Sequence, residues 1–151
     1  DPALVIHYFK NKQQLFAESI SELICSRQAK RATTALTTAA DPSQVGKNVA
    51  QAFIDTLADT ETLQLLLGLI RSAASDEQAA QISREFMEEI LIAEVEPYIA
   101  GPDSRLKASL ISSQFIGLIT LRYIIKLEPI ASATPDQLAA YLAPRIQQGL
   151  E

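Results

Sequence analysis

The sequence predicts an all-helical protein. Apolar residues recur every three to four positions along most of the 151-residue chain, which is the spacing of one helix face. No segment alternates apolar and polar residues over the length of a strand. With 48% hydrophobic residues, 5 glycines and 7 prolines, the chain has the composition of a globular protein that buries one core.

A short helix followed directly by a long one is predicted at the N-terminal end. Pro2 suits the first turn of a helix that ends near Phe9. Asn11 is then a natural N-cap, and Gln14 stands at the matching position of a capping box. The second helix therefore begins at once, and we expect it to extend to about Thr37.

Helix-starting and helix-breaking residues divide the rest of the chain into five more helices. Thr60 or Thr62 is the expected N-cap of the second of these, and Ser75 that of the third. Pro144 is expected to kink the last helix. The predicted helices occupy residues 43–58, a segment with an apolar core at 63–70, a segment from 75 to about 100, 103–126 and 135–149.

The most apolar stretch of the chain, residues 110–125, also contains Ser112, Gln114 and Arg122. We expect it to be too short and too polar to span a bilayer, and to form a helix buried on two sides. No secretory leader is evident, and the single cysteine, Cys25, is expected to serve packing rather than redox chemistry. These features favour a cytoplasmic protein without a membrane partner.

Charge is unevenly distributed along the chain, whose formal net charge is −5. Residues 1–31 contain five basic and three acidic residues, whereas the remainder contains eight basic and fifteen acidic residues. Any contact with nucleic-acid phosphates is therefore expected at the N-terminal end.

The first sixteen residues, DPALVIHYFKNKQQLF, resemble the end of the helix-turn-helix in TetR-family transcriptional regulators. There a short recognition helix ends in an aromatic pair and is followed by a small N-cap residue, a lysine and a leucine. Ile6 departs from the aromatic residue or histidine often found at its position, which leaves the base preference open. The resemblance implies that the residues at the DNA are Ala3, Leu4, His7, Tyr8 and Lys12.

The chemistry of these side chains suits such an interface. His7, Tyr8 and Lys12 can donate to phosphates, and Ala3 and Leu4 can contact thymine methyl groups. Val5 and Phe9 are expected to face inward onto the rest of the head. The alternative is that the run from His7 to Phe9 simply covers the second helix as an aromatic plug.

Segments near the C-terminus also look similar to TetR-family ligand-binding domains. They are Phe115-Ile116-Gly117-Leu118, Arg122-Tyr123, Leu127-Glu128-Pro129-Ile130 and Leu142-Ala143-Pro144. The resemblance implies a remnant of the DNA-binding head in residues 1–25 and a ligand-binding and dimerisation bundle in residues 26–151. The first two helices of the head are not in this sequence, so operator binding is expected of the full-length protein only.

The helix at 103–126 is predicted to be apolar on two opposite sides. In TetR-like proteins one side of such a helix meets a second copy and the other lines a ligand cavity. Gly117 costs the helix about 1 kcal/mol relative to alanine, which a close crossing at the dimer axis would offset. Close packing within one subunit is an equally good explanation of Gly117. The expected homodimer interface comprises Leu110, Ser113, Gly117, Leu121, Ile125, Leu138 and Leu142.

The effector is expected to be small and largely apolar, because polar anchors are scarce in the apolar helices. Taken singly, each apolar residue of the expected cavity is more often a core residue than a ligand contact. For Arg122, satisfying backbone carbonyls or Glu128 is favoured over holding an acidic group of a ligand. The expected lining is Phe53, Leu57, Leu66, Ile70, Phe86, Ile90, Phe115 and Ile119, with Gln114 or Arg122 as polar anchor.

Catalysis is not expected, because the chain has a single histidine, a single cysteine and no glycine-rich phosphate loop. Glu85, Glu88 and Glu89 have the spacing of a helical carboxylate site but lack its Glu-x-x-His pair, so a solvated face is favoured and no cofactor or metal is expected. The sequence thus predicts a ligand-responsive DNA-binding regulator, a repressor released by its effector. The alternative is a helical protein-interaction or small-molecule-binding bundle without DNA binding.

Overall fold

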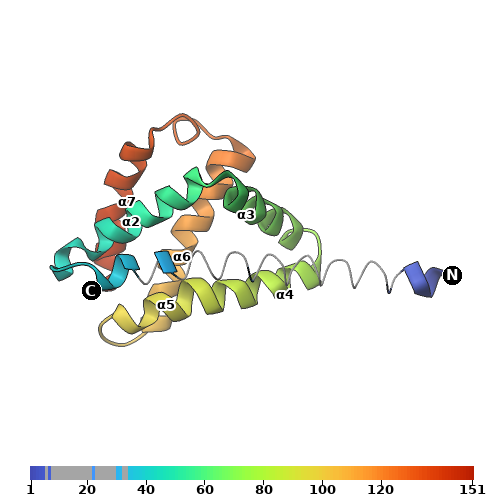
Figure 1. The fold of residues 1–151 in the computed structure, drawn as a ribbon, viewed down its shortest axis with the longest axis horizontal. Helices are drawn as coiled ribbons and strands as arrows, with labels where there is room; N and C mark the ends of the chain where they lie inside the picture. The colour runs from blue at the N-terminus through green and yellow to red at the C-terminus, as the bar shows by residue number, and fades with distance from the viewer. Residues whose placement is uncertain (6, 8–21, 23–29, 32–33) are drawn as a thin grey trace.

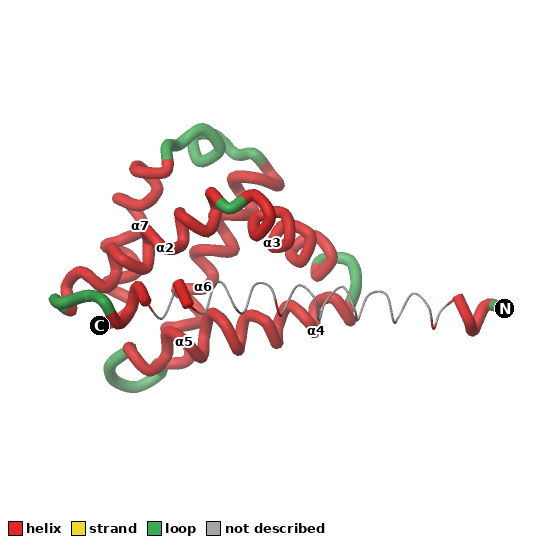
Figure 2. Tube along the Cα trace, in the orientation of Figure 1, coloured by secondary structure: helices red, strands yellow, loops and turns green. Residues whose placement is uncertain are grey.

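The computed structural model describes residues 1–5, 7, 22, 30–31 and 34–151. Every regular element in these ranges is helical, so the predicted all-helical class is confirmed (Figure 2). Residues 2–5 form a helical turn, and residues 34–37 are helical, which agrees with a second helix ending near Thr37. Most of that second helix, including Cys25, lies outside the described residues.

The bundle consists of five main helical segments, shown in Figure 1. Helix α2 (Val45–Ala58) follows the short turn η1 (Pro42–Gln44), and α3 (Thr60–Ala73) comes next. The third segment is continuous through α4 (Glu77–Phe86), η2 (Met87–Ile92), α5 (Ala93–Val95) and η3 (Glu96–Tyr98). The last two are α6 (Ser104–Ile119), extended by η4 (Thr120–Ile125), and α7 (Pro135–Leu150), which continues through Pro144.

Aspartates cap two of these helices where the sequence analysis expected threonine or serine. Asp59 precedes α3 and accepts a hydrogen bond from the backbone N–H of Thr62 at 3.3 Å. Asp76 precedes α4 and accepts one from the N–H of Ala79 at 2.8 Å. The predicted caps Thr60, Thr62 and Ser75 are therefore wrong. Each lies close to an aspartate, whose carboxylate competes equally well for the capping position.

Helix α7 begins with the strongest local signal in the chain. Thr134 accepts from the N–H of Gln137 at 3.2 Å, and the Gln137 side chain accepts from the N–H of Thr134 at 2.9 Å. Pro135 occupies the first helical position, as expected, where its missing N–H costs nothing. The start of α7 is thus fixed by local chemistry.

Helices α2 and α7 pack closely side by side (Figures 1 and 2). A Cβ added at Gly46 would lie 2.6 Å from the carbonyl oxygen of Ala143 and 2.7 Å from Cβ of Gln147. The N–H of Gly46 donates to Oε1 of Gln147 at 2.8 Å. Only glycine permits this approach, so Gly46 sets the distance between the two backbones.

Buried apolar side chains form two adjoining clusters. The first joins α2, α3, α4, η2 and the C-terminal half of α6, and includes Leu66, Phe86 and Ile119. The second joins α2, the end of the α4 segment, the N-terminal half of α6 and α7, and includes Ile111 and Ile146. Phe53 packs against both clusters, which makes α2 the element common to the whole core.

The helix Ser104–Ile125 is less buried than the sequence analysis predicted. At 22 residues, and with a mean hydropathy of 1.4 over its most apolar 18-residue window, it meets the length and composition of a membrane span, so residues 110–125 underestimated the length of the helix. Only 33% of its most apolar window is buried. Leu106, Leu110 and Ile125 are 60%, 57% and 60% exposed. Within one subunit, therefore, only one side of this helix is covered.

Replacing Gly46 by alanine should destabilise the fold by about 2 kcal/mol, because the new methyl group meets backbone and Cβ atoms that cannot move aside. Gly68 on α3 is the matched control, since a Cβ there meets nothing within 4 Å. Gly68→Ala should leave stability unchanged or raise it by up to about 1 kcal/mol through helix propensity. Urea unfolding measures both, and equal effects would contradict the close approach of α2 and α7.

Candidate effector site and subunit interface

The N-terminal turn presents its side chains to solvent. Leu4 is 70% exposed, and Ala3 and His7 are exposed as well. Asp1 starts the turn by accepting a hydrogen bond from the N–H of Ala3 at 3.0 Å. Val5, expected to face inward, is 53% exposed in this chain.

Three residues of the predicted recognition element, Tyr8, Phe9 and Lys12, lie outside the described residues. The DNA-contact assignment and the aromatic-plug alternative both depend on them. Both therefore stay predictions.

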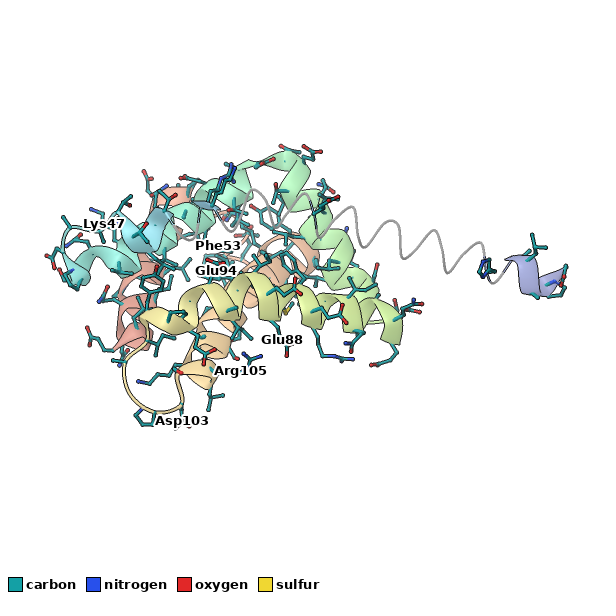
Figure 3. All side chains as sticks on the ribbon, turned by 60° about the horizontal axis from the view of Figure 1, so that its bottom comes forward. Lys47, Phe53, Glu88, Glu94, Asp103 and Arg105 are labelled. Carbon is teal, nitrogen blue, oxygen red and sulfur yellow. The ribbon has the colours of Figure 1, made fainter. Side chains whose placement is uncertain are left out.

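The apolar residues predicted to line a cavity come together in the bundle interior. Phe53 of α2 and Phe115 of α6 stack with ring centroids 4.3 Å apart. Figure 3 shows Phe53 between α2 and the α4–α5 segment. Ile70 packs against the first cluster from its edge. The members buried in that cluster are Leu57, Leu66, Phe86, Ile90 and Ile119.

The interior offers few unpaired polar groups among the described residues. Its buried hydroxyls belong to Thr56, Thr62, Ser83 and Ser112. Three of them donate to the backbone carbonyl four residues earlier, each at 2.9 Å. The fourth, Thr62, donates to Oδ2 of Asp59 at 3.1 Å. A molecule inside the bundle would meet mostly apolar surface, because these hydroxyls are already paired.

The two candidate polar anchors, Arg122 and Gln114, differ in whether their hydrogen-bonding groups are already paired. Nη1 of Arg122 donates to the carbonyl oxygens of Ile130 and Ala133, at 2.6 and 2.9 Å. The structure thus follows the alternative in which Arg122 satisfies backbone carbonyls, while Glu128 accepts from the hydroxyl of Ser132 at 2.6 Å. Arg122 also borders a cavity of about 210 Å³ with Leu57.

Gln114 retains an unused acceptor. Its Oε1 atom is buried and has no hydrogen-bond partner. A buried amide oxygen without a donor is costly, so this position favours a ligand or a partner subunit that supplies one.

The predicted dimer residues on α6 and η4 share one face of the helix. Leu110 and Ile125 are among the most exposed apolar side chains, and Ser113 is also exposed. A Cβ at Gly117 would meet nothing within 4 Å. Among the residues that the structure describes, nothing packs closely on Gly117, and they leave this face open.

The open face continues onto α7. A cavity of about 590 Å³ lies between Leu118 of α6, the loop that precedes α7, and α7 itself. Its lining includes the half-buried Leu138 and Leu142, both predicted interface residues, and Tyr141, which is 70% exposed. Leu127 of the same region is 47% exposed. Apolar surface thus extends from one side of α6 across to α7.

Residues 43–150 match the family model described as "Tetracyclin repressor-like, C-terminal domain". The chain belongs to this family. The fold is also similar to the crystal structure of a TetR-family regulator from Streptomyces coelicolor A3, with a TM-score of 0.67 and 24% sequence identity. That match covers 99% of this chain and 97% of the other. No curated protein matches the sequence.

Membership of the TetR family makes the chain part of a ligand-responsive transcriptional regulator. Regulators of this family act through operator DNA, small-molecule effectors and dimers, and are generally not enzymes. The family match begins at Ser43 and covers the bundle. The bundle is therefore the part of this TetR-type chain whose structure bears on ligand and subunit contacts.

Glu85, Glu88 and Glu89 are exposed, as a solvated face requires. Glu85 accepts from the side-chain amide of Gln81 at 2.8 Å. Arg105 of α6 lies 3.5 Å from Glu88 and 3.6 Å from Glu96, and Figure 3 shows Arg105 and Glu88 close together. Among the described residues there is no group of three potential metal ligands.

Gly46 is the structural residue that sequence reasoning missed. It lies among polar neighbours in the first turn of α2, and one glycine in a helix does not reveal what approaches it. The only available signal was its cost in helix propensity, which Gly46 and Gly117 share. Their surroundings, which differ completely, are a property of the folded chain.

Replacing Arg122 by methionine should destabilise the protein by about 2 kcal/mol, because two backbone carbonyls of the α6–α7 loop lose a charged donor. Arg105→Gln is the matched control, since the Arg105 side chain is 57% exposed and its ion pairs should contribute less than about 1 kcal/mol. Thermal or urea unfolding measures the difference. Equal losses in the two variants would contradict a structural role for Arg122.

Proposed function

We propose that the protein is a cytoplasmic TetR-type repressor that releases its operator when a small, largely apolar effector enters the bundle. In this proposal residues 1–25 belong to the DNA-binding head, and residues 26–151 bind the effector and form the homodimer. The observation that carries the proposal is the combination of an apolar interior with an uncovered apolar helix face. The apolar interior suits a ligand, and the uncovered helix face suits contact with another copy of the chain.

The effector site is proposed around the Phe53–Phe115 stack. This pair lies where the two core clusters adjoin, so a ligand there would touch α2 and α6 together with η2. The paired hydroxyls of the interior support an apolar ligand. The buried Oε1 of Gln114 supports one hydrogen-bond donor on the ligand or on the partner subunit.

The dimer is proposed on the face of α6 and η4 that carries Leu110, Ser113, Gly117, Leu121 and Ile125, together with Leu138 and Leu142 of α7. Leaving this much apolar surface in water is unfavourable by about 25 cal/mol per Å². Gly117 stands in the middle of the face with open space in front of it. A helix from a second copy can therefore approach closely at this point.

The effector acts in this proposal by shifting a population. The two recognition turns of a dimer must reach successive major grooves, so their separation decides whether DNA is bound. An effector that binds better to a different arrangement of the bundle lowers the population that fits DNA. Because Phe115 and the interface residues share α6, both sites act on one element.

Leu110→Glu should convert the dimer into a monomer without unfolding it, because Leu110 is exposed in the subunit but would be buried between copies. Ala100→Glu adds the same charge at an exposed loop position and is the control. Light scattering after size-exclusion chromatography gives the mass, and circular dichroism the helix content. A Leu110→Glu protein that is still dimeric would contradict this placement of the interface.

The full-length protein should retard its own promoter DNA in a mobility-shift assay, and an apolar effector should release the DNA. Phe53→Ala should still bind DNA but should need about tenfold more effector, because a stacked aromatic pair is lost. Phe53 is partly buried, so circular dichroism must first show an intact fold. Absence of binding to any promoter fragment would overturn the repressor assignment and favour a helical binding module without DNA contact.

A further inference from the structure

A groove rimmed by polar side chains lies on the outside of the bundle. It has a volume of about 450 Å³ and runs between Lys30, Arg31 and residues 34–38 on one side and helix α2 on the other. Ala35 and Ala52 lie at its base, and their small side chains leave the space. The side chains around them are Lys30, Arg31, Thr34, Thr38, Asn48, Gln51 and Asp55.

Arg31 has an unused hydrogen-bond donor beside this groove. Its Nη1 atom is buried and has no hydrogen-bond partner within the described part of the chain. Its Nη2 atom lies 3.8 Å from Oδ2 of Asp59, which is an ion-pair distance and too long for a hydrogen bond. Both carboxylate oxygens of Asp59 already accept from Thr62. The guanidinium is therefore placed at the groove without a bidentate acceptor.

The other lining groups indicate which kind of ligand could pair with the Arg31 guanidinium. Lys30 adds a second positive charge, and Asp55 is the acid among the lining residues, while Asp59 lies beside Arg31 outside the lining. One oxygen of Asp55 accepts from the side-chain amide of Gln51 at 2.9 Å. Thr34 and Asn48 contribute a hydroxyl and an amide on opposite walls. An oxyanion fits the cations, and hydroxyl groups fit the remaining acceptors and donors.

We propose that this groove binds a small hydroxylated oxyanion, a carboxylate or phosphate on a polyol body, held by Arg31 and Lys30. A volume of about 450 Å³ is within the usual range of small-molecule sites. The bound molecule bridges the segment that follows the N-terminal region and helix α2. The site is separate from the apolar interior and would admit a second class of ligand. A regulatory effect on DNA rests on the proposed function, whereas binding does not.

Isothermal titration of the chain with glycerol 3-phosphate and with glycerate tests the proposal, and glycerol is the uncharged control probe. We expect saturable binding of at least one anion and none of glycerol, and the stronger probe tells a phosphate site from a carboxylate site. Arg31→Gln should weaken that binding about tenfold or more, because a charge-assisted hydrogen bond is lost. No saturable binding of either anion would overturn the proposal.

Arg71→Gln is the matched control variant, since Arg71 is exposed in the last turn of α3 and does not line the groove. It should bind as the unaltered chain does. Equal weakening by Arg71→Gln and Arg31→Gln would mean nonspecific charge attraction and would overturn the site. If Arg31→Gln fails to fold, the exposed Lys30→Gln decides, with a several-fold loss expected and no loss contradicting the proposal. No DNA is present, so a failed repressor assignment leaves this result unaffected.

Discussion

The helix Ser104–Ile125 is apolar around most of its circumference, and the subunit covers only one side of it. This one-sided coverage determines both how the interior is organised and which apolar surface stays exposed. The covered side supplies Phe115 and Ile119 to the two core clusters and so organises the interior. The uncovered side carries Leu110 and Ile125, whose exposure calls for a second surface. In the proposed function, ligand and subunit contacts therefore lie on the same element.

Three features hold that element in position. Arg122 donates hydrogen bonds to the carbonyl oxygens of Ile130 and Ala133, so the loop after the helix folds back onto the helix. Gly46 lets α2 approach α7 closely, and α7 in turn packs on α6. The helix N-terminus is tied by Arg105 to Glu88 and Glu96 on its neighbour. The apolar contacts provide most of the stabilisation, and these polar contacts fix the register.

Much of the bundle could be predicted from the sequence because prolines and capping residues mark the helix ends. The capping box at Thr134 and the breaks around Pro42 and Pro129 depend only on neighbouring residues, so the folded chain keeps the helix boundaries that they predict. The caps of α3 and α4 were misplaced by one to three residues because Asp59 and Asp76 compete with neighbouring hydroxyls. The π-helical segments η2 and η4 were not predictable, since widening a helix by one residue scarcely changes its apolar pattern.

The candidate sites were less predictable, because they depend on what approaches a residue. The apolar residues expected around a cavity do converge, yet Arg122 is committed to the loop carbonyls. The roles of Gly46 and Gly117 could be told apart only in the folded chain. Sedimentation equilibrium of the unaltered chain tests the central claim most directly, because one-sided coverage of Ser104–Ile125 requires a partner. We predict a particle of twice the chain mass throughout the micromolar range. A stable monomer with intact helix content would contradict the account.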